Sequence, residues 1–230
     1  MKKIEIKEFG GPEVLEIKNV DIGKPGQNEV LVKNLSIGIN YIDTYHRSGL
    51  YPIPLPSGIG LEACSIIEEV GSEVKLFKVG DRVTRASMPI GTYSEKQIIP
   101  EDKLVKVPDN ISDEVASCIT LKGITAEYLL HRTYKVKKGD KILYHAAAGA
   151  LGQIFCPWAN ALGAEIIGTV GSDEKIEIAK KNGCHHVINY NEKNFVEEVE
   201  KIVGKNGLDV VYDGVGAKTF EGSIEVLKVR

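Results

Sequence analysis

The chain has 230 residues, of which 43% are hydrophobic, and a formal net charge of -3 at pH 7. This length is enough for one large or two small domains with a buried core. The near-neutral charge argues against a nucleic-acid or anionic-membrane surface, because both need a dense basic patch. No apolar run approaches the ~20 residues of a membrane-spanning helix, and the first residues lack the apolar core of a signal peptide.

The cysteines and histidines predict no metal site. Cys64, Cys118, Cys156 and Cys184 lie far apart and form no C-x-x-C pair. They are typical of reduced packing residues in a cytoplasmic protein. The five histidines form no H-x-x-x-H or H-E-x-x-H pair, which are the spacings that bind metal from one helix.

Short strand-like runs broken by glycine and proline fill the chain to about residue 110. Such runs lie at 2–9, 29–40, 64–71, 80–86 and 92–100. The segment "YPIPLPSG" is expected to be a loop, because its three prolines cannot donate to a sheet ladder. The spacing of the runs predicts a compact, mostly β domain over residues 1–115.

Helices and strands alternate from about residue 112, and this alternation defines a second domain over residues 116–230. A first helix over 114–134 is capped by Ser112 or Asp113. Strands are expected at 141–147, 164–171, 185–190 and 208–216, and helices at 151–162, 173–183, 195–203 and from 218. The repetition predicts a parallel, doubly wound sheet, so the fold class is α/β with a separate β domain.

The turn after the first of these strands is almost free of side chains. Ala147-x-Gly149-x-x-Gly152 takes the place of a G-x-G-x-x-G pattern. Small residues let the backbone turn tightly and approach a pyrophosphate, which the N–H groups of the helix N-terminus then hold. The strand, turn, helix and second strand in register strengthen an otherwise weak motif. A tight turn without a ligand is the alternative.

The end of the second strand bears on which dinucleotide binds. An NAD site needs a carboxylate there for the ribose hydroxyls, but this strand ends in Val170, Gly171 and Ser172. Ser172 has the character of a helix cap. Lys175 can neutralise a 2′-phosphate, unless it is simply a solvated helix residue. The sequence favours NADP(H), and Asp173 keeps NAD as the alternative.

Pro157 is expected about two turns into the helix that follows the turn. There it removes the hydrogen bond to the Gln153 carbonyl and clashes with it, at a cost of about 3 kcal/mol. The helical stripe that begins at Leu151 therefore predicts a kink. A helix that begins later, with Pro157 nearer its first turn, is the alternative.

Several motifs, in order along nearly the whole chain, resemble the zinc-free quinone oxidoreductases. This is the zeta-crystallin-like branch of the medium-chain dehydrogenases/reductases. The matching segments are "FGGPEVLE", "IGINYIDTYHRSGLYP", "VGSEVKLFKVGDRV", "LKGITAEYLL", "HAAAGALG", "GTVGSDEK", "VINY" and "DVVYDGVG". The resemblance implies a GroES-like β domain followed by a Rossmann domain that binds NADPH.

The resemblance also implies roles for individual residues. Gly171, Lys175 and Tyr190 would hold the adenosine 2′-phosphate end, and the turn with Ala147, Gly149, Ala150, Leu151 and Gly152 the pyrophosphate. Asn40 and Thr125 would lie near the nicotinamide, and Tyr45 and Tyr51 would line the quinone pocket as candidate catalytic residues. Taken alone, such tyrosines are more often packing residues. Zinc-dependent relatives carry a cysteine in place of Asn40 and His-Glu in place of Leu61-Glu62, so no metal is expected.

The activity implied by the resemblance is transfer of a hydride or electrons from NADPH to a quinone, without nucleic-acid or membrane partners. Two alternatives stay open. One is a truncated, non-catalytic remnant of such an enzyme, and the other is an enoyl or alkenal reductase of the same superfamily.

Only four of the six strands of a Rossmann sheet are predicted, so the chain is expected to be C-terminally truncated. The fourth strand, over 208–216, would then carry an unpaired apolar edge. Family members form homodimers, and the usual dimer contact would fall in the missing part.

Overall fold

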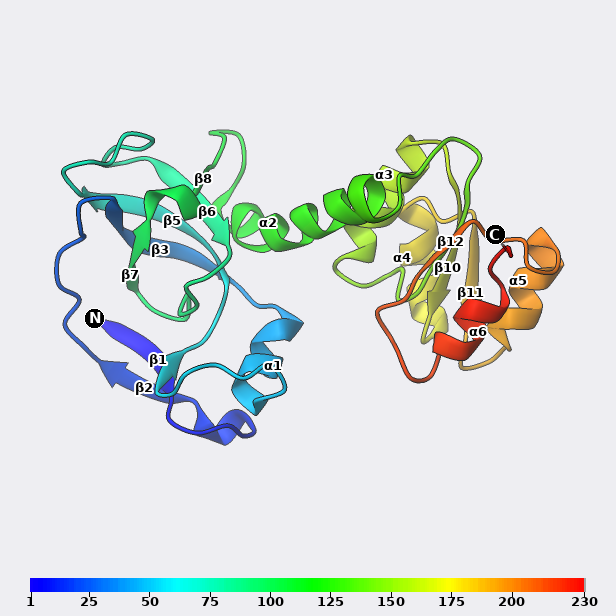
Figure 1. The fold of residues 1–230 in the computed structure, drawn as a ribbon, viewed down its shortest axis with the longest axis horizontal. Coiled ribbons are helices and arrows are strands. Elements are labelled where there is room, and N and C mark those ends of the chain that lie inside the picture. Colours follow the sequence, from blue (N-terminus) through cyan, green and yellow to red (C-terminus); the bar gives the residue numbers. More distant parts are fainter. Residues whose placement is uncertain (230) are drawn as a thin grey trace. The chain divides into compact units, whose positions relative to one another are not determined.

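The computed structural model describes residues 1–229. The chain divides into two compact units, Met1–Leu121 and Lys122–Arg230, and each is described by itself (Figure 1). The division falls within α2 (Asp113–Tyr128), a few residues after the predicted boundary at residue 115. Among the described residues, no helix combines the length and the hydrophobicity that crossing a bilayer requires.

The first unit is built on two antiparallel sheets. A five-stranded sheet has the order β7-β3-β5-β6-β8, and a three-stranded sheet has the order β2-β1-β4. The strands are β1 (Lys2–Ile6), β2 (Glu16–Asn19), β3 (Glu29–Gly38), β4 (Ser57–Gly58), β5 (Glu62–Val70), β6 (Arg82–Ala86), β7 (Lys96–Pro100) and β8 (Val105–Lys106). Apart from β4, the proline-rich segment 51–58 forms no strand, as predicted.

The helical elements of the first unit are short. They are the 3-10 turns η1 (Pro12–Val14) and η2 (Glu101–Lys103) and the helix α1 (Tyr41–Ser48). The helix α1 was not predicted, because its buried residues are the polar Asp43 and His46 and not an apolar stripe. The helix ends at Gly49, whose φ of 79° is a left-handed conformation that glycine adopts readily.

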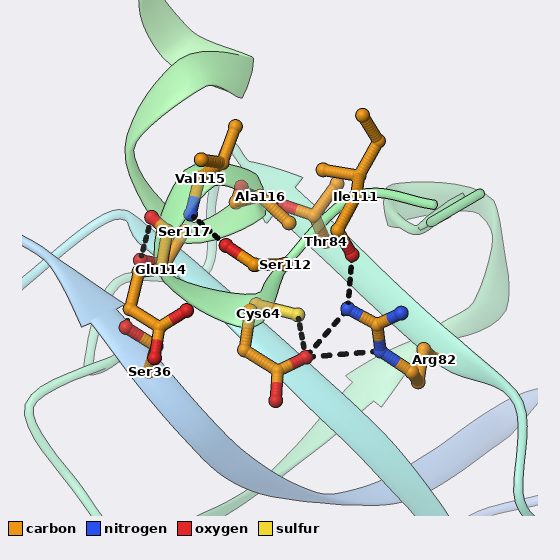
Figure 2. Close-up of polar contacts among 11 residues, drawn as sticks. Ser36, Cys64, Arg82, Thr84, Ile111, Ser112, Glu114, Val115, Ala116 and Ser117 are labelled. Carbon is orange, nitrogen blue, oxygen red and sulfur yellow. Dashed lines mark hydrogen bonds and ion pairs between the residues drawn. The ribbon is translucent and has the colours of Figure 1, made fainter. Parts of the chain in front are cut away.

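Polar contacts fix the first turn of α2 to the sheet of the first unit (Figure 2). Arg82 on β6 donates to Asp113 Oδ1 from Nε at 2.9 Å and from Nη2 at 2.6 Å. The Cys64 thiol donates to the same oxygen at 3.5 Å, and burial raises the pKa of that thiol to about 11. The Ser112 hydroxyl accepts the N–H of Val115 at 3.3 Å, so Ser112 is the cap of α2.

The second unit is a four-stranded parallel sheet with the order β11-β10-β9-β12. Its strands are β9 (Lys141–Tyr144), β10 (Glu165–Val170), β11 (His186–Asn189) and β12 (Val210–Tyr212). Its helices are α3 (Gly152–Ala161), α4 (Ile176–Lys181), α5 (Phe195–Val203) and α6 (Phe220–Glu225), with a π-helical turn η3 (Leu129–Thr133) and a 3-10 turn η4 (Asp173–Lys175). Counted along the chain, the strand order is 3-2-1-4, which confirms the predicted doubly wound fold.

Both faces of this sheet are covered, α3 and α4 on one side and α5 and α6 on the other (Figure 1). Successive residues of β9 therefore enter different cores. Ile142 packs in the cluster of Phe155 from α3, and Leu143 in that of Val199 from α5. Burial on both faces explains why consecutive residues such as Ile142-Leu143 and Ile166-Ile167 are both apolar.

Two details of the second unit correct the sequence analysis. The helix α3 begins at Gly152 and continues through Pro157, so the alternative of a later start was wrong. The edge predicted to be unpaired over 208–216 is paired at its first residue. Leu227, after α6, forms a parallel bridge with Leu208, whose carbonyl accepts the N–H of Lys228 at 2.9 Å. The residues after α6 thus begin to pair as a fifth strand would.

Candidate functional site

The turn at 147–152 lies at the carboxyl end of β9 and leads into α3. The N–H of Ala147 donates to the Thr169 carbonyl at 3.0 Å, and that of Gly149 to the Ala146 carbonyl at 2.8 Å. Ala146 adopts a left-handed φ of 57° in this turn. A Cβ on Gly152 would lie 2.3 Å from the Ala147 carbonyl oxygen, so the turn closes in this way only with glycine at 152.

Several backbone N–H groups of this turn are available to a ligand. Those of Ala148, Ala150, Leu151 and Gly152 donate to no acceptor within residues 1–229. They lie at the N-terminus of α3, where unsatisfied donors and the helix dipole together favour an anion. The mostly small residues of the turn and its free donors fit a pyrophosphate.

The end of β10 is the second candidate for an anion-binding element. Gly171 directly follows the strand, and a Cβ there would lie 3.0 Å from the Tyr190 hydroxyl oxygen. The Asn191 side-chain amide donates to the Gly171 carbonyl at 2.7 Å, which fixes the two loops together. Lys175 on η4 is exposed, and it forms no ion pair in the described part of the chain. Gly171, Lys175 and Tyr190 therefore come from neighbouring segments at one edge of the sheet.

The carboxylate of Asp173, two residues before Lys175, already accepts a hydrogen bond. Asp173 Oδ1 accepts a hydrogen bond from Asn189 Nδ2 at 2.8 Å. Ser172 stands at the N-cap of η4, but its side chain makes no capping hydrogen bond, so its predicted capping role was wrong. An uncompensated lysine beside an occupied carboxylate suits a phosphate better than a pair of ribose hydroxyls.

Tyr45 and Tyr51 lie in the first unit and contact each other. Their ring centroids are 5.3 Å apart, and the Tyr51 N–H donates to the Tyr45 carbonyl at 3.2 Å. Tyr41 packs edge-on against Tyr45 with a centroid distance of 5.4 Å. Tyr41 and Tyr51 are 77% and 50% exposed. The three rings form an accessible aromatic cluster of the kind that binds a flat apolar ligand.

Asn40, at the start of α1, belongs to a buried polar network. Its side-chain Nδ2 donates to Glu62 Oε2 at 2.9 Å, and Glu62 Oε1 accepts the N–H of Leu121 at 2.7 Å. The backbone N–H of Asn40 and the Tyr93 hydroxyl both donate to Asp43 Oδ2 at 2.9 Å. Burial raises the pKa of the Asp43 carboxyl. Glu62 thus orients the Asn40 side-chain amide, and Asp43 holds the Asn40 backbone.

The predicted site residues fall in the two units. Asn40, Tyr45 and Tyr51 lie in the first, and Thr125, on α2, lies in the second with the glycine turn and the Lys175 region. Within the described residues, no group of three or more His, Cys, Asp or Glu side chains is arranged to hold a metal ion.

Sequence reasoning missed the buried acids that support Asn40. Glu62 is fully buried, and its partner Leu121 lies 59 residues away along the chain. Asp43 offered one local signal, because an acid three residues after an asparagine is a capping-box pattern.

Comparison with known proteins assigns the chain to a family. The model of the alcohol dehydrogenase GroES-like domain matches residues 26–109, and that of the zinc-binding dehydrogenases matches residues 150–230. The chain is 48% identical over 230 residues to a quinone oxidoreductase of Pseudomonas aeruginosa, covering 100% of this chain and 71% of that protein. The chain belongs to the zinc-free quinone oxidoreductase family of the medium-chain dehydrogenases/reductases.

Other members of the family are equally similar. A 2-haloacrylate reductase from a Burkholderia species is 47% identical, over 98% of this chain and 69% of its own length. The crystal structure of Escherichia coli quinone oxidoreductase complexed with NADPH is 49% identical with a TM-score of 0.96, and the match covers 100% of this chain and 71% of that one. The chain thus spans about 70% of the length of these relatives, and the resemblance seen in its motifs is confirmed.

Proposed function

We propose that this protein binds NADP(H) and transfers a hydride or electrons from NADPH to a quinone, a small molecule that it meets in the cytoplasm. The observation that carries this proposal is the pairing of two anion sites in the second unit. One is the N–H cradle at 147–152, and the other is the uncompensated Lys175 beside Gly171. The family relative solved with NADPH supports the same cofactor.

The residues present fit the cofactor. The free N–H groups of the turn would hold the pyrophosphate, and Lys175 and Tyr190, beside Gly171, would hold the 2′-phosphate. Asn40 and Thr125 are assigned to the nicotinamide by the family resemblance, and the buried Glu62 orients the Asn40 amide. The cofactor supplies the hydride, while the protein supplies position and electrostatics.

The aromatic cluster of the first unit is the proposed quinone contact. Tyr45 and Tyr51 present ring faces and edges to a flat acceptor, which such rings bind by offset stacking or edge contacts. A tyrosine hydroxyl beside the acceptor would donate a hydrogen bond to the oxyanion that develops on reduction.

A second candidate reaction is reduction of an electron-poor carbon–carbon double bond. The 47% identity to a 2-haloacrylate reductase favours it specifically. Both reactions use the same cofactor site, so the acceptor alone distinguishes them. A third possibility, that this 230-residue chain is a non-catalytic remnant, is tested by the same experiments.

The first test is a thermal melt of the chain with no ligand, with NADPH and with NADH. A ligand at 100 times its dissociation constant adds about 2.7 kcal/mol to the free energy of unfolding, which raises the melting temperature visibly. We expect NADPH to stabilise more than NADH. If neither cofactor raises the melting temperature, the proposal is contradicted. The chain is then best described as a non-catalytic remnant.

The 2′-phosphate assignment is tested by replacing Lys175 with alanine. Affinity for NADPH should fall about tenfold, and affinity for NADH should not change, because only NADPH carries the phosphate. Lys180→Ala is the matched control, since Lys180 is an exposed lysine on α4 that already pairs with Glu177 at 2.9 Å. Turnover is then compared between a benzoquinone and 2-chloroacrylate. No turnover of the quinone by a chain that binds NADPH overturns the proposed reaction.

A further inference from the structure

His145 lies directly before the glycine turn and is almost completely buried, with 2% of its surface exposed. Its Nδ1 lies 2.8 Å from the Thr169 hydroxyl on β10, and its Nε2 lies 3.1 Å from the Ser223 hydroxyl on α6. The Ser223 hydroxyl in turn donates to Asp213 Oδ2 at 2.8 Å. We refer to Thr169, His145, Ser223 and Asp213 as the buried relay.

With a neutral imidazole, one arrangement of hydrogens satisfies the buried relay. The Asp213 carboxylate accepts only, because its hydrogen bonds outweigh the effect of burial and lower its pKa. The Ser223 hydroxyl therefore donates to Asp213 and accepts from His145 Nε2–H. In the neutral imidazole, His145 Nδ1 is then the acceptor for the Thr169 hydroxyl. Burial lowers the pKa of His145, consistent with that neutral form.

The far end of the relay fixes the loop after β12. Asp213 Oδ1 accepts the N–H groups of Val215 and Gly216, each at 2.9 Å, and the Thr219 hydroxyl at 2.9 Å. One carboxylate thus connects residues 213, 215, 216 and 219 of this loop. The tip of the loop is open, because a Cβ added to Gly214 or Gly216 would meet nothing within 4 Å.

The sheet order shows what this loop is placed to do. In β11-β10-β9-β12, chain order reverses at β9, and a dinucleotide binds across the carboxyl ends of the strands at such a reversal. The half of the ligand that carries the 2′-phosphate belongs to the β10 side, where Lys175 lies. The other half then falls on the β12 side, where the 213–216 loop begins.

We propose that the buried relay is a positioning device for the cofactor. His145 and Ser223 hold the 213–216 loop in register with the glycine turn, so that this loop forms the wall of the nicotinamide-ribose half of the site. The proposal rests on the proposed NADP(H) function and adds to it the group that aligns the two halves. His145 and Ser223 act through the loop and have no contact with the reacting atoms.

The test compares two ligands on the 230-residue chain with and without the substitution Ser223→Ala. NADPH spans both halves of the site, whereas adenosine 2′,5′-bisphosphate occupies only the half on the β10 side. We expect Ser223→Ala to weaken NADPH about five- to tenfold, as loss of one buried hydrogen bond does, and to change affinity for the bisphosphate less than about twofold. In the enzyme assay the KM for NADPH should rise.

Two further variants separate positioning from a general loss of stability. Asp213→Asn keeps the shape of the side chain but removes acceptor capacity, and it should show the same selective loss of NADPH affinity. Ser65→Ala removes a hydroxyl of equal burial in the first unit, where Ser65 donates to Asn34 Oδ1 at 2.7 Å. It should lower the melting temperature without a difference between the two ligands.

The outcomes distinguish the two proposals. If the unsubstituted chain binds neither ligand, the NADP(H) function fails and the positioning role fails with it. If it binds both, and Ser223→Ala and Asp213→Asn weaken both equally or neither, only the positioning role is overturned. Selective weakening of NADPH by both variants supports it.

Discussion

The glycine turn of the second unit and the Asn40 network of the first unit are built in opposite ways. The turn offers backbone N–H groups, and it works because side chains are missing at Gly149 and Gly152. The Asn40 network offers one side-chain amide, and it works because the buried carboxylate of Glu62 accepts from that amide while the carboxylate of Asp43 accepts from the backbone N–H of Asn40.

The difference decides which change damages each region. A backbone site has no group to delete, so it is broken by added atoms. A side-chain site tolerates small changes in volume, but it is broken by the loss of a donor or acceptor, since an unpaired buried polar group costs free energy.

The largest effect is expected from Gly152→Ala. The new Cβ would lie 2.3 Å from the Ala147 carbonyl oxygen, and backbone cannot move aside cheaply. We expect a loss of about 3 kcal/mol in the free energy of unfolding together with loss of NADPH binding. Urea denaturation and a binding titration measure the two.

Gly123→Ala is the control for that substitution. Gly123 lies in α2, and a Cβ there would meet nothing within 4 Å. Replacing a helical glycine by alanine should raise stability by up to about 1 kcal/mol. Equal stability losses for the two variants would show that contact at Gly152 is not the cause.

Pro157→Ala tests the helix behind the turn in the opposite direction. Pro157 lies inside α3, where the ring denies the Gln153 carbonyl its hydrogen bond. Alanine restores that bond but also frees the unfolded chain, so we expect a net gain of about 2 kcal/mol. No gain in a thermal or urea melt would mean that α3 has already adapted to the proline, as the predicted kink would allow.

Whether a region could be predicted depends on how far apart along the chain its interacting residues lie. Ala147, Gly149 and Gly152 fall within six residues, so the demands of a tight strand-to-helix turn are visible in local spacing. The packing of Glu62 against Leu121 joins residues 59 positions apart and leaves no local pattern. The helix α1 was missed because its buried side chains are polar, and Ser172 was misjudged because position alone does not decide whether a hydroxyl caps a helix.

A matched pair of aspartates sharpens the comparison. Both oxygens of Asp213 accept hydrogen bonds, and these lower its pKa. Asp43 uses one oxygen for both its donors, its Oδ1 has no partner among the described residues, and burial raises its pKa. Replacing Asp213 by asparagine should cost about 2 kcal/mol. The same change at Asp43 should cost less than about 1 kcal/mol, because the amide can direct its NH₂ away from both donors.

Urea denaturation at pH 7 measures both aspartate variants. Comparable losses would contradict the distinction, since they would mean that the charge of Asp43 is as well satisfied as that of Asp213. A larger loss of unfolding free energy for Asp43→Asn would reverse the distinction. It would mean that the charged carboxylate matters more at Asp43 than at Asp213.

The smallest effect is the pH dependence that His145 adds to the second unit. Burial lowers its pKa below the ordinary value of 6.5, so the unfolded chain takes up a proton before the folded chain does. Stability must therefore fall as the pH drops below about 6.5, by at most about 1.4 kcal/mol per pH unit, until the folded-state pKa is reached. We expect His145 to account for up to about 1 kcal/mol of loss between pH 7 and pH 5.5.

His145→Gln removes the titration while keeping a side chain with a donor and an acceptor. The variant starts from a lower stability, so the quantity to compare is the slope of unfolding free energy against pH rather than its value. A shallower slope in the variant assigns the acid sensitivity to the buried imidazole. Parallel slopes would mean that His145 takes up a proton as readily in the folded chain as in the unfolded one. The relay would then have to tolerate an imidazolium, with the Thr169 hydroxyl turned to accept rather than donate.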